Sequence, residues 1–175
     1  NRENLKFILE VAKILKLKKN FLIKTLKKFK GLKYRQEIIY QSKKLTIIND
    51  SKATTFSSSV SFLKSLTNVY WIVGGQAKKG DKLLLPQKNY KNFKAYIFGA
   101  NKDFFISKIK KLMKIESFSD LKSLIKKLSI EIKTEKKTIH KTILFSPSAA
   151  SFDDFKNFEE RGEYFNKLIK KYINA

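Results

Sequence analysis

The sequence predicts an α/β fold, with a mostly parallel β-sheet, flanking helices and a helical hairpin before the first strand. Three observations favour this fold. Short runs of apolar and β-branched residues, of the length of buried strands, recur along the chain. Segments with apolar residues at helical spacing lie between these runs. Such alternation is typical of parallel strands joined by right-handed crossovers, and 175 residues suffice to bury a substantial core.

Two amphipathic segments precede the first predicted strand. The chain begins at Asn1 without an initiator methionine, so we expect it to be part of a longer protein. The second segment is expected to be capped by Asn20 and to end at Gly31, which makes the pair a helical hairpin. The first segment, residues 3–17, places five apolar residues on one helical face: Leu5, Ile8, Leu9, Ala12 and Leu15.

The remaining elements follow in a regular order. A polar turn at residues 42–44 separates the first two strands, which we expect to pair as a hairpin at a sheet edge. A further helix is expected to start near Leu83–Leu85 but meets Pro86. The predicted strands are residues 37–41, 45–48, 69–73, 95–98, 113–115 and 142–145. Four helices are predicted from apolar groups: Phe56, Val60, Leu63 and Leu66; Phe104, Phe105, Ile109 and Leu112; Leu121, Leu124, Ile125 and Leu128; and Phe155, Phe158, Phe165, Leu168 and Tyr172.

The net charge of +24 raises the question of nucleic-acid binding, since strongly basic domains often bind polyanions. Only three of the 39 basic residues are arginines, namely Arg2, Arg35 and Arg161. Proteins that read phosphates and bases depend heavily on the bidentate arginine fork. The lysines are spread over nearly every segment, so we interpret the charge as a lysine-rich surface and expect no specific nucleic acid. A basic nucleic-acid-binding module is the alternative interpretation.

Other compositional features exclude whole classes of protein. The chain has no cysteine and a single histidine, His140, so neither thiolate nor histidine-cluster metal sites are expected. No apolar run approaches the length of a membrane span. The sequence also lacks a phosphate loop, a dinucleotide-binding fingerprint and a nucleophile elbow. This chain alone therefore has no evident motif for binding a nucleoside triphosphate with magnesium. We expect a cytoplasmic, monomeric protein.

The turn after the strand at residues 45–48 carries more chemistry than a connection needs. Asp50 supplies a carboxylate and Lys52 a cation, while Ser51 and Thr54 supply hydroxyls. In open α/β sheets, ligands bind at the carboxyl ends of strands, beside the N-terminus of the following helix. The sequence therefore predicts a ligand site here. The alternative is a polar turn in which a serine or threonine caps the next helix.

Two later strand ends are also unusual. Gly74 and Gly75 follow a strand and let the backbone approach a ligand, and Lys78 can then reach an anion; the alternative is a flexible lysine-bearing loop. The small residues at 146–151 leave backbone amides exposed, which suits a carboxylate. The alternative there is that Ser151 simply caps the final helix.

The chain carries, in this order, the motifs Asn1-Arg2-Glu3-Asn4, Gly31 to Glu37, Asn49-Asp50-Ser51-Lys52-Ala53-Thr54, Gly74-Gly75 with Lys78, and Ser146 to Gly162. Together these motifs resemble those of the Mur ligases, over the whole chain and most closely in their D-glutamate-adding branch. The resemblance implies that residues 1–35 are the end of an ATP-binding central domain. Residues 36–175 would then be the complete, Rossmann-like C-terminal domain.

The resemblance also implies an activity, that of an ATP-dependent amide-forming ligase of peptidoglycan synthesis. Such ligases phosphorylate the carboxylate of UDP-N-acetylmuramoyl-L-alanine with ATP, and the amine of D-glutamate then attacks the acyl phosphate. The phosphate and magnesium sites would lie mainly outside this chain, so we expect the isolated chain to be inactive. A non-catalytic scaffold of the same fold is a further alternative.

Matching motifs assign roles to nine residues. Lys78 falls near the reacting phosphate, but Gln76 stands where an acidic residue can occur and so removes one acidic partner for it. Tyr34 stands where the family usually has histidine. The resemblance places D-glutamate against Lys52, Thr54, Ser151 and Phe158. It places the nucleotide or its surroundings near Asn1, Asn4, Arg35 and Asp50.

Overall fold

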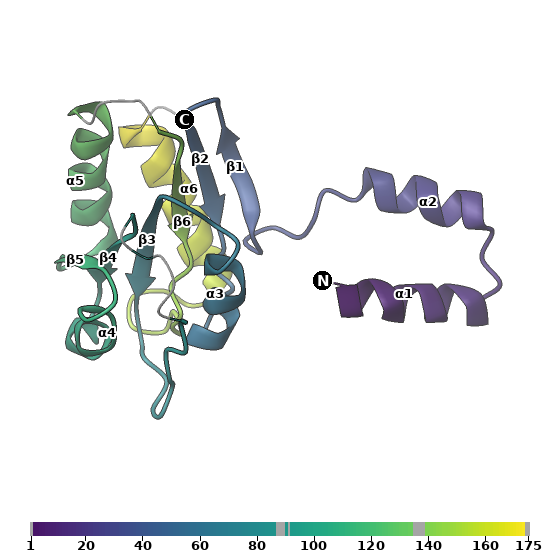
Figure 1. Ribbon diagram of the computed structural model, residues 1–175, viewed down its shortest axis with the longest axis horizontal. Coiled ribbons are helices and arrows are strands. Elements are labelled where there is room, and N and C mark those ends of the chain that lie inside the picture. Colours follow the sequence, from purple (N-terminus) through teal and green to yellow (C-terminus); the bar gives the residue numbers. More distant parts are fainter. Residues whose placement is uncertain (1, 87–89, 91, 135–138, 174–175) are drawn as a thin grey trace. The chain divides into compact units, whose positions relative to one another are not determined.

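The computed structural model describes residues 2–86, 90, 92–134 and 139–173, so Asn1 lies outside the described residues. The chain divides into two compact units, Asn1–Leu32 and Lys33–Ala175. The second unit is an α/β domain with a mostly parallel sheet and helices on both faces (Figure 1), which confirms the predicted fold class.

The first unit contains the two predicted helices, α1 (Arg2–Ile14) and α2 (Lys19–Lys28). The predicted cap at Asn20 is wrong, because Lys18 is extended and α2 already begins at Lys19. The Leu17 N–H bonds to the Ala12 carbonyl at 2.9 Å and closes the turn just before that point. Of the predicted apolar face, Ala12 is buried, whereas four of its members are exposed: Leu5, Ile8, Leu9 and Leu15.

The second unit is built on a six-stranded sheet with the order β1-β2-β6-β3-β4-β5. β1 pairs antiparallel with β2, as the predicted edge hairpin requires, and the other neighbouring pairs are parallel. β6 lies between β2 and β3, so the last strand in the sequence is central in the sheet. The strands are β1 (Glu37–Gln41), β2 (Leu45–Asn49), β3 (Val69–Gly74), β4 (Lys94–Phe98), β5 (Lys114–Ser117) and β6 (Lys141–Phe145).

Four helices cover the sheet, two on each face. α3 (Phe56–Leu63) and α4 (Lys102–Ile109) share one apolar cluster with the sheet. α5 (Leu121–Thr134) and α6 (Phe158–Tyr172) share the other. The expected helix start at Leu83–Leu85 is wrong: these residues lie in no regular element, in keeping with the proline that follows. Among the described residues, no helix is both long and apolar enough to cross a membrane.

β3 is an uninterrupted apolar run because it is buried on both faces of the sheet. Trp71 and Val73 belong to the α3–α4 cluster, and Tyr70 and Ile72 to the α5–α6 cluster. Successive side chains of a strand point to opposite faces, and here both faces are covered. Stacked rings extend the packing on the α6 side, where Phe145 and Phe165 lie with their centroids 4.3 Å apart.

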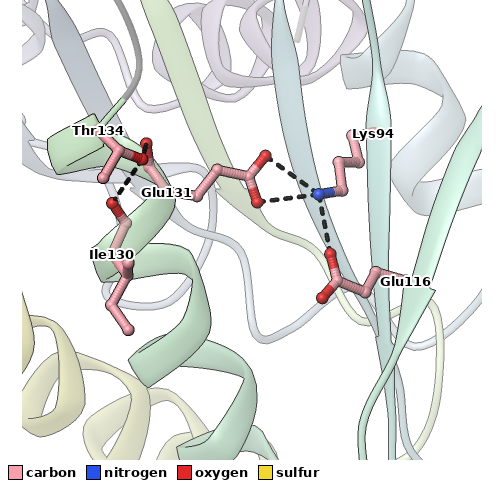
Figure 2. Close-up of polar contacts among 5 residues, drawn as sticks. All are labelled: Lys94, Glu116, Ile130, Glu131 and Thr134. Carbon is pink, nitrogen blue, oxygen red and sulfur yellow. Dashed lines mark hydrogen bonds and ion pairs between the residues drawn. The ribbon is translucent and has the colours of Figure 1, made fainter.

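A half-buried ion-pair cluster joins β4, β5 and α5 (Figure 2). The Lys94 ammonium donates to both carboxylate oxygens of Glu131, at 3.0 and 2.9 Å, and lies 2.9 Å from a carboxylate oxygen of Glu116. Lys94 is the first residue of β4, so the cluster lies toward the amino ends of the strands. It stabilises the outer strands at a distance from the strand ends that carry the predicted site residues.

Candidate functional site

The segments that follow β2, β3 and β6 meet at one edge of the sheet, which we call the carboxyl edge (residues 50–54, 75–78 and 146–151). The three strands are neighbours and parallel, so their carboxyl ends lie side by side. Backbone hydrogen bonds join the segments directly: the Gly74 N–H donates to the Pro147 carbonyl, and Gln76 and Ala150 exchange two bonds, all at 3.0 Å. Ligands of open α/β sheets bind at such edges.

Asp50 is buried at the end of β2 and is held on both carboxylate oxygens. One oxygen accepts the backbone N–H of Gln36 at 3.1 Å, and the other accepts the Ser146 hydroxyl at 2.9 Å. Burial raises the pKa of Asp50 from its usual 3.8 to about 6, although both hydrogen bonds and the charge of Arg35 oppose the shift. The predicted nucleotide-side residues Asp50 and Arg35 are therefore electrostatically coupled.

Asp50 is connected, through Ser146, to a hydrogen-bonded network of buried serine hydroxyls. The Ser59 hydroxyl lies 2.6 Å from that of Ser146 and 2.7 Å from that of Ser148, which links α3 to the segment after β6. The Trp71 indole N–H donates to the Ser146 carbonyl at 2.8 Å. Ser148 has a φ of 56°, a left-handed conformation that serine rarely adopts. The network fixes the start of the segment after β6 against the core.

The raised pKa of Asp50 predicts a specific pH dependence of stability. Because the folded state binds this proton more tightly than the unfolded chain, Asp50 contributes stability below about pH 4, and that contribution is lost as the pH rises through about 6. A shift of about two pKa units corresponds to roughly 3 kcal/mol. Asp50→Asn has no such contribution to lose. As the pH rises from about 4 to 7, the free energy of unfolding of the variant minus that of the wild type should therefore increase by up to about 3 kcal/mol. Urea unfolding at both pH values tests this, and a constant difference would contradict it.

Lys52 and Phe158, both predicted to contact D-glutamate, lie together. The Lys52 ammonium sits 3.9 Å from the centroid of the Phe158 ring, within the range of a cation–π interaction. The Ser51 hydroxyl donates to the Phe158 carbonyl at 2.8 Å, and the Lys52 N–H donates to the Tyr34 carbonyl at 3.0 Å. The start of α6 therefore orients the lysine that follows β2.

Ser151 and Thr54 do not cap helices. α6 begins only at Phe158, and its cap is Asn157, whose side chain accepts the Glu160 N–H at 2.8 Å. The capping alternative for Ser151 is therefore wrong; Ser151 is buried, and its carbonyl accepts the Phe155 N–H at 2.9 Å. The cap of α3 is Thr55, so a threonine of this turn does cap the next helix, as the alternative states, while the exposed Thr54 does not.

The other predicted site residues are more dispersed. Lys78 is exposed in the segment after β3, two residues beyond the paired Gln76, and Arg35 is exposed just before β1. Asn4 is exposed in α1, in the other unit, and Asn1 lies outside the described residues. In the part of the chain that the structure describes, no group of three or more histidine, aspartate and glutamate residues could hold a metal ion.

Sequence reasoning missed Arg161, which the structure places under the carboxyl edge. Arg161 lies in α6 and is fully buried. Its guanidinium donates to the carbonyls of Ser51, Ala149 and Ala150, at 2.7, 2.9 and 3.1 Å. Its Nε also donates to the Ser51 hydroxyl at 3.2 Å. Two signals were available: Arg161 lies in the motif from Ser146 to Gly162, and it is one of only three arginines in a chain that almost always uses lysine.

Comparison with known proteins identifies the relatives of this chain. No protein-family model matches it. It is 37% identical over 173 residues to the UDP-N-acetylmuramoylalanine–D-glutamate ligase of Wolbachia sp. subsp. Brugia malayi (strain TRS), covering 98% of this chain and 34% of the ligase. The chain is related to the D-glutamate-adding Mur ligases. The ligases of the same name from Francisella tularensis subsp. tularensis (strain SCHU S4) and subsp. novicida (strain U112) are each 35% identical, over 97% of this chain and 40% of the ligase.

The match to the Mur ligases confirms the resemblance seen in the motifs. It runs through both units of the structure, because it covers all but a few residues of the chain. The chain spans only about a third to two fifths of the length of these relatives. The similarity therefore extends over only part of each of these ligases.

Proposed function

We propose that the chain is part of an ATP-dependent ligase that joins D-glutamate to UDP-N-acetylmuramoyl-L-alanine in peptidoglycan synthesis, in the cytoplasm. The observation that carries this proposal is the meeting of the segments after β2 and β6 at one edge of the sheet, in a relative of D-glutamate ligases. The role of this chain is to bind D-glutamate and to present its amine to the activated substrate. We also propose that the protein is a monomer.

D-Glutamate has two carboxylates and so needs two separated anion sites. We assign one to Lys52 and Thr54, after β2, and the other to Ser151 and the nearby backbone amides, after β6. Phe158 holds Lys52 in place through the cation–π contact. Each charge-assisted hydrogen bond to a carboxylate contributes about 1.5–3 kcal/mol, so two such sites suffice for selective binding.

The phosphate and metal sites of the nucleotide are proposed to lie mainly outside this chain. We propose that residues 1–35 end an ATP-binding domain and that residues 36–175 form the domain that closes over it. Asn1, Asn4, Arg35 and Asp50 would then contact ATP or its surroundings, and Lys78 would lie near the reacting phosphate. The longer relatives leave room for magnesium ligands outside these 175 residues.

The proposed contribution of this chain to the reaction is positional. In the ligase reaction ATP phosphorylates the substrate carboxylate, and the amine of D-glutamate attacks the resulting acyl phosphate. Fixing a nucleophile in attack geometry can lower a barrier by about 7–11 kcal/mol in the most favourable cases. Lys52 and Ser151 would fix D-glutamate in this geometry by holding both of its carboxylates, and the amine stays free to react. The isolated chain should therefore fold but not catalyse.

A chimera tests the proposal. These 175 residues replace the matching segment of the Wolbachia ligase, and phosphate release is measured with ATP, magnesium, UDP-N-acetylmuramoyl-L-alanine and D-glutamate. We expect release that depends on D-glutamate from the chimera, and none from the 175-residue chain alone. A folded chimera that binds ATP but whose phosphate release is independent of D-glutamate would contradict the proposal, as would activity of the isolated chain.

A further inference from the structure

We infer that Arg161 is a positioning residue that sets the distance between the two anion sites, and so selects the length of the diacid. The inference deepens the proposed function, on which the identity of the ligand rests. Arg161 does not face the ligand in this account. It acts through the two segments that its guanidinium holds together.

The contacts of Arg161 include the residue directly before Lys52 and the residue directly before Ser151, one at each proposed anion site. Its Nη2 donates to the Ser51 carbonyl, directly before Lys52, and its Nη1 donates to the Ala150 carbonyl, directly before Ser151. One planar group thus links the segments after β2 and β6. Because the guanidinium is rigid and its donors diverge at fixed angles, it fixes the spacing of the two segments as well as their proximity.

A third segment closes against the same guanidinium. Gly75, after β3, has a φ of 123°, and a Cβ added there would lie 3.1 Å from Nη1 of Arg161 and 2.8 Å from the Ala150 carbonyl. Glycine is therefore required for the close approach of this segment. The carbonyls do not fully compensate the positive charge of the buried Arg161, because burial lowers its pKa to about 10. The negative charge of Asp153, in the loop before α6, opposes that shift.

The Lys52 side chain is coupled to the same group. The Arg161 Nε donates to the Ser51 hydroxyl, which in turn donates to the Phe158 carbonyl. Phe158 provides the ring above which the Lys52 ammonium lies. A change at Arg161 therefore propagates to the cation of the first anion site and to the backbone of the second. A lysine in its place keeps the charge but cannot bond three carbonyls in one plane.

The test compares the wild-type 175-residue chain with Arg161→Lys, using titration calorimetry with D-glutamate and with the shorter D-aspartate. We expect Arg161→Lys to weaken D-glutamate binding by at least about tenfold and to bring the ratio of the two affinities close to one. Leu128→Val is the matched control: it loosens the buried face of α5 while leaving the carboxyl edge intact, so the affinity ratio should stay at the wild-type value. A folded Arg161→Lys variant with the wild-type ratio would overturn the inference.

A second readout separates this inference from the proposed function. In nuclear magnetic resonance spectra, the Lys52 side-chain protons should be shifted upfield by the Phe158 ring. Arg161→Lys should reduce that shift and move the Ser151 amide resonance together with it, whether or not D-glutamate binds. Unchanged resonances at both residues would overturn the inference. Absence of D-glutamate binding by the wild type would instead count against the proposed function.

A second variant, which keeps Arg161 itself, tests the inference even if Arg161→Lys does not fold. Ser51→Ala deletes the hydroxyl that accepts from Nε of Arg161 and donates to the Phe158 carbonyl, and it leaves the carbonyl contacts of Arg161 in place. We expect a smaller change of the affinity ratio in the same direction. A folded Ser51→Ala variant with wild-type affinities and a wild-type Lys52 side-chain shift would overturn the inference.

Discussion

Replacing Lys52 by alanine is expected to raise the KM of the chimeric ligase for D-glutamate by about 10- to 140-fold, which corresponds to one lost charge-assisted contact of 1.5–3 kcal/mol. The KM for ATP should change by less than about twofold, because Lys52 is not among the residues proposed to contact the nucleotide. The reason is electrostatic: Lys52 is half-buried beside the Phe158 ring, so its ammonium is pre-positioned for an anion before the ligand arrives.

Steady-state kinetics with each substrate varied in turn measure this effect. Lys64→Ala is the matched control, since Lys64 is exposed at the far end of α3 and its removal changes the net charge equally. If both variants changed the D-glutamate KM alike, the effect would reflect the overall positive charge and the assignment of Lys52 would be wrong.

Gly74→Ala is expected to destabilise the chain by about 3 kcal/mol or more, the range of severe backbone substitutions. Gly74 ends β3 with a φ of 144°, and a Cβ built there would lie 2.1 Å from the Phe98 carbonyl oxygen in β4. The obstacle is backbone, which no rotation of a side chain can relieve. The two neighbouring strands would have to separate at the carboxyl edge.

Urea unfolding followed by circular dichroism measures the loss, with Gly80→Ala as the control. Gly80 also has a positive φ, of 77°, but no heavy atom lies within 4 Å of the Cβ position. Its substitution should cost only about 1 kcal/mol, the conformational term for a non-glycine residue in this region. Equal losses in the two variants would show that the contact with β4 has no energetic weight.

The sequence was sufficient to predict most of the elements, the edge hairpin and the mostly parallel sheet, but not the order of the strands. The runs at β3 and β6 identify strands buried on both faces, and the apolar spacing in α5 identifies a helix, because these signals are local. The insertion of β6 between β2 and β3 depends on how the crossovers pack, which no local pattern encodes. Asn20 failed as a cap because the turn after α1 decides where α2 begins.

For the candidate site, too, local sequence patterns predicted some features and missed others. Lys52 and Ser151 could be singled out because polar residues follow strands, and parallel strands bring their carboxyl ends to one edge. The contact of Lys52 with Phe158 could not be derived from patterns, because α6 lies far along the chain. Arg161 was missed because a helical position facing the sheet is ordinarily apolar, and only the structure shows the three carbonyls around its guanidinium.

Titration of the isotopically labelled 175-residue chain with D-glutamate, followed by nuclear magnetic resonance, tests the central claim most directly. Two separate segments are proposed to share one diacid, so the amide resonances of Lys52 and Ser151 should move together, with a single dissociation constant. D-Alanine, which has only one carboxylate, should move at most one of the two. Resonances that move independently, or an equal response to D-alanine, would contradict a shared diacid site at the carboxyl edge.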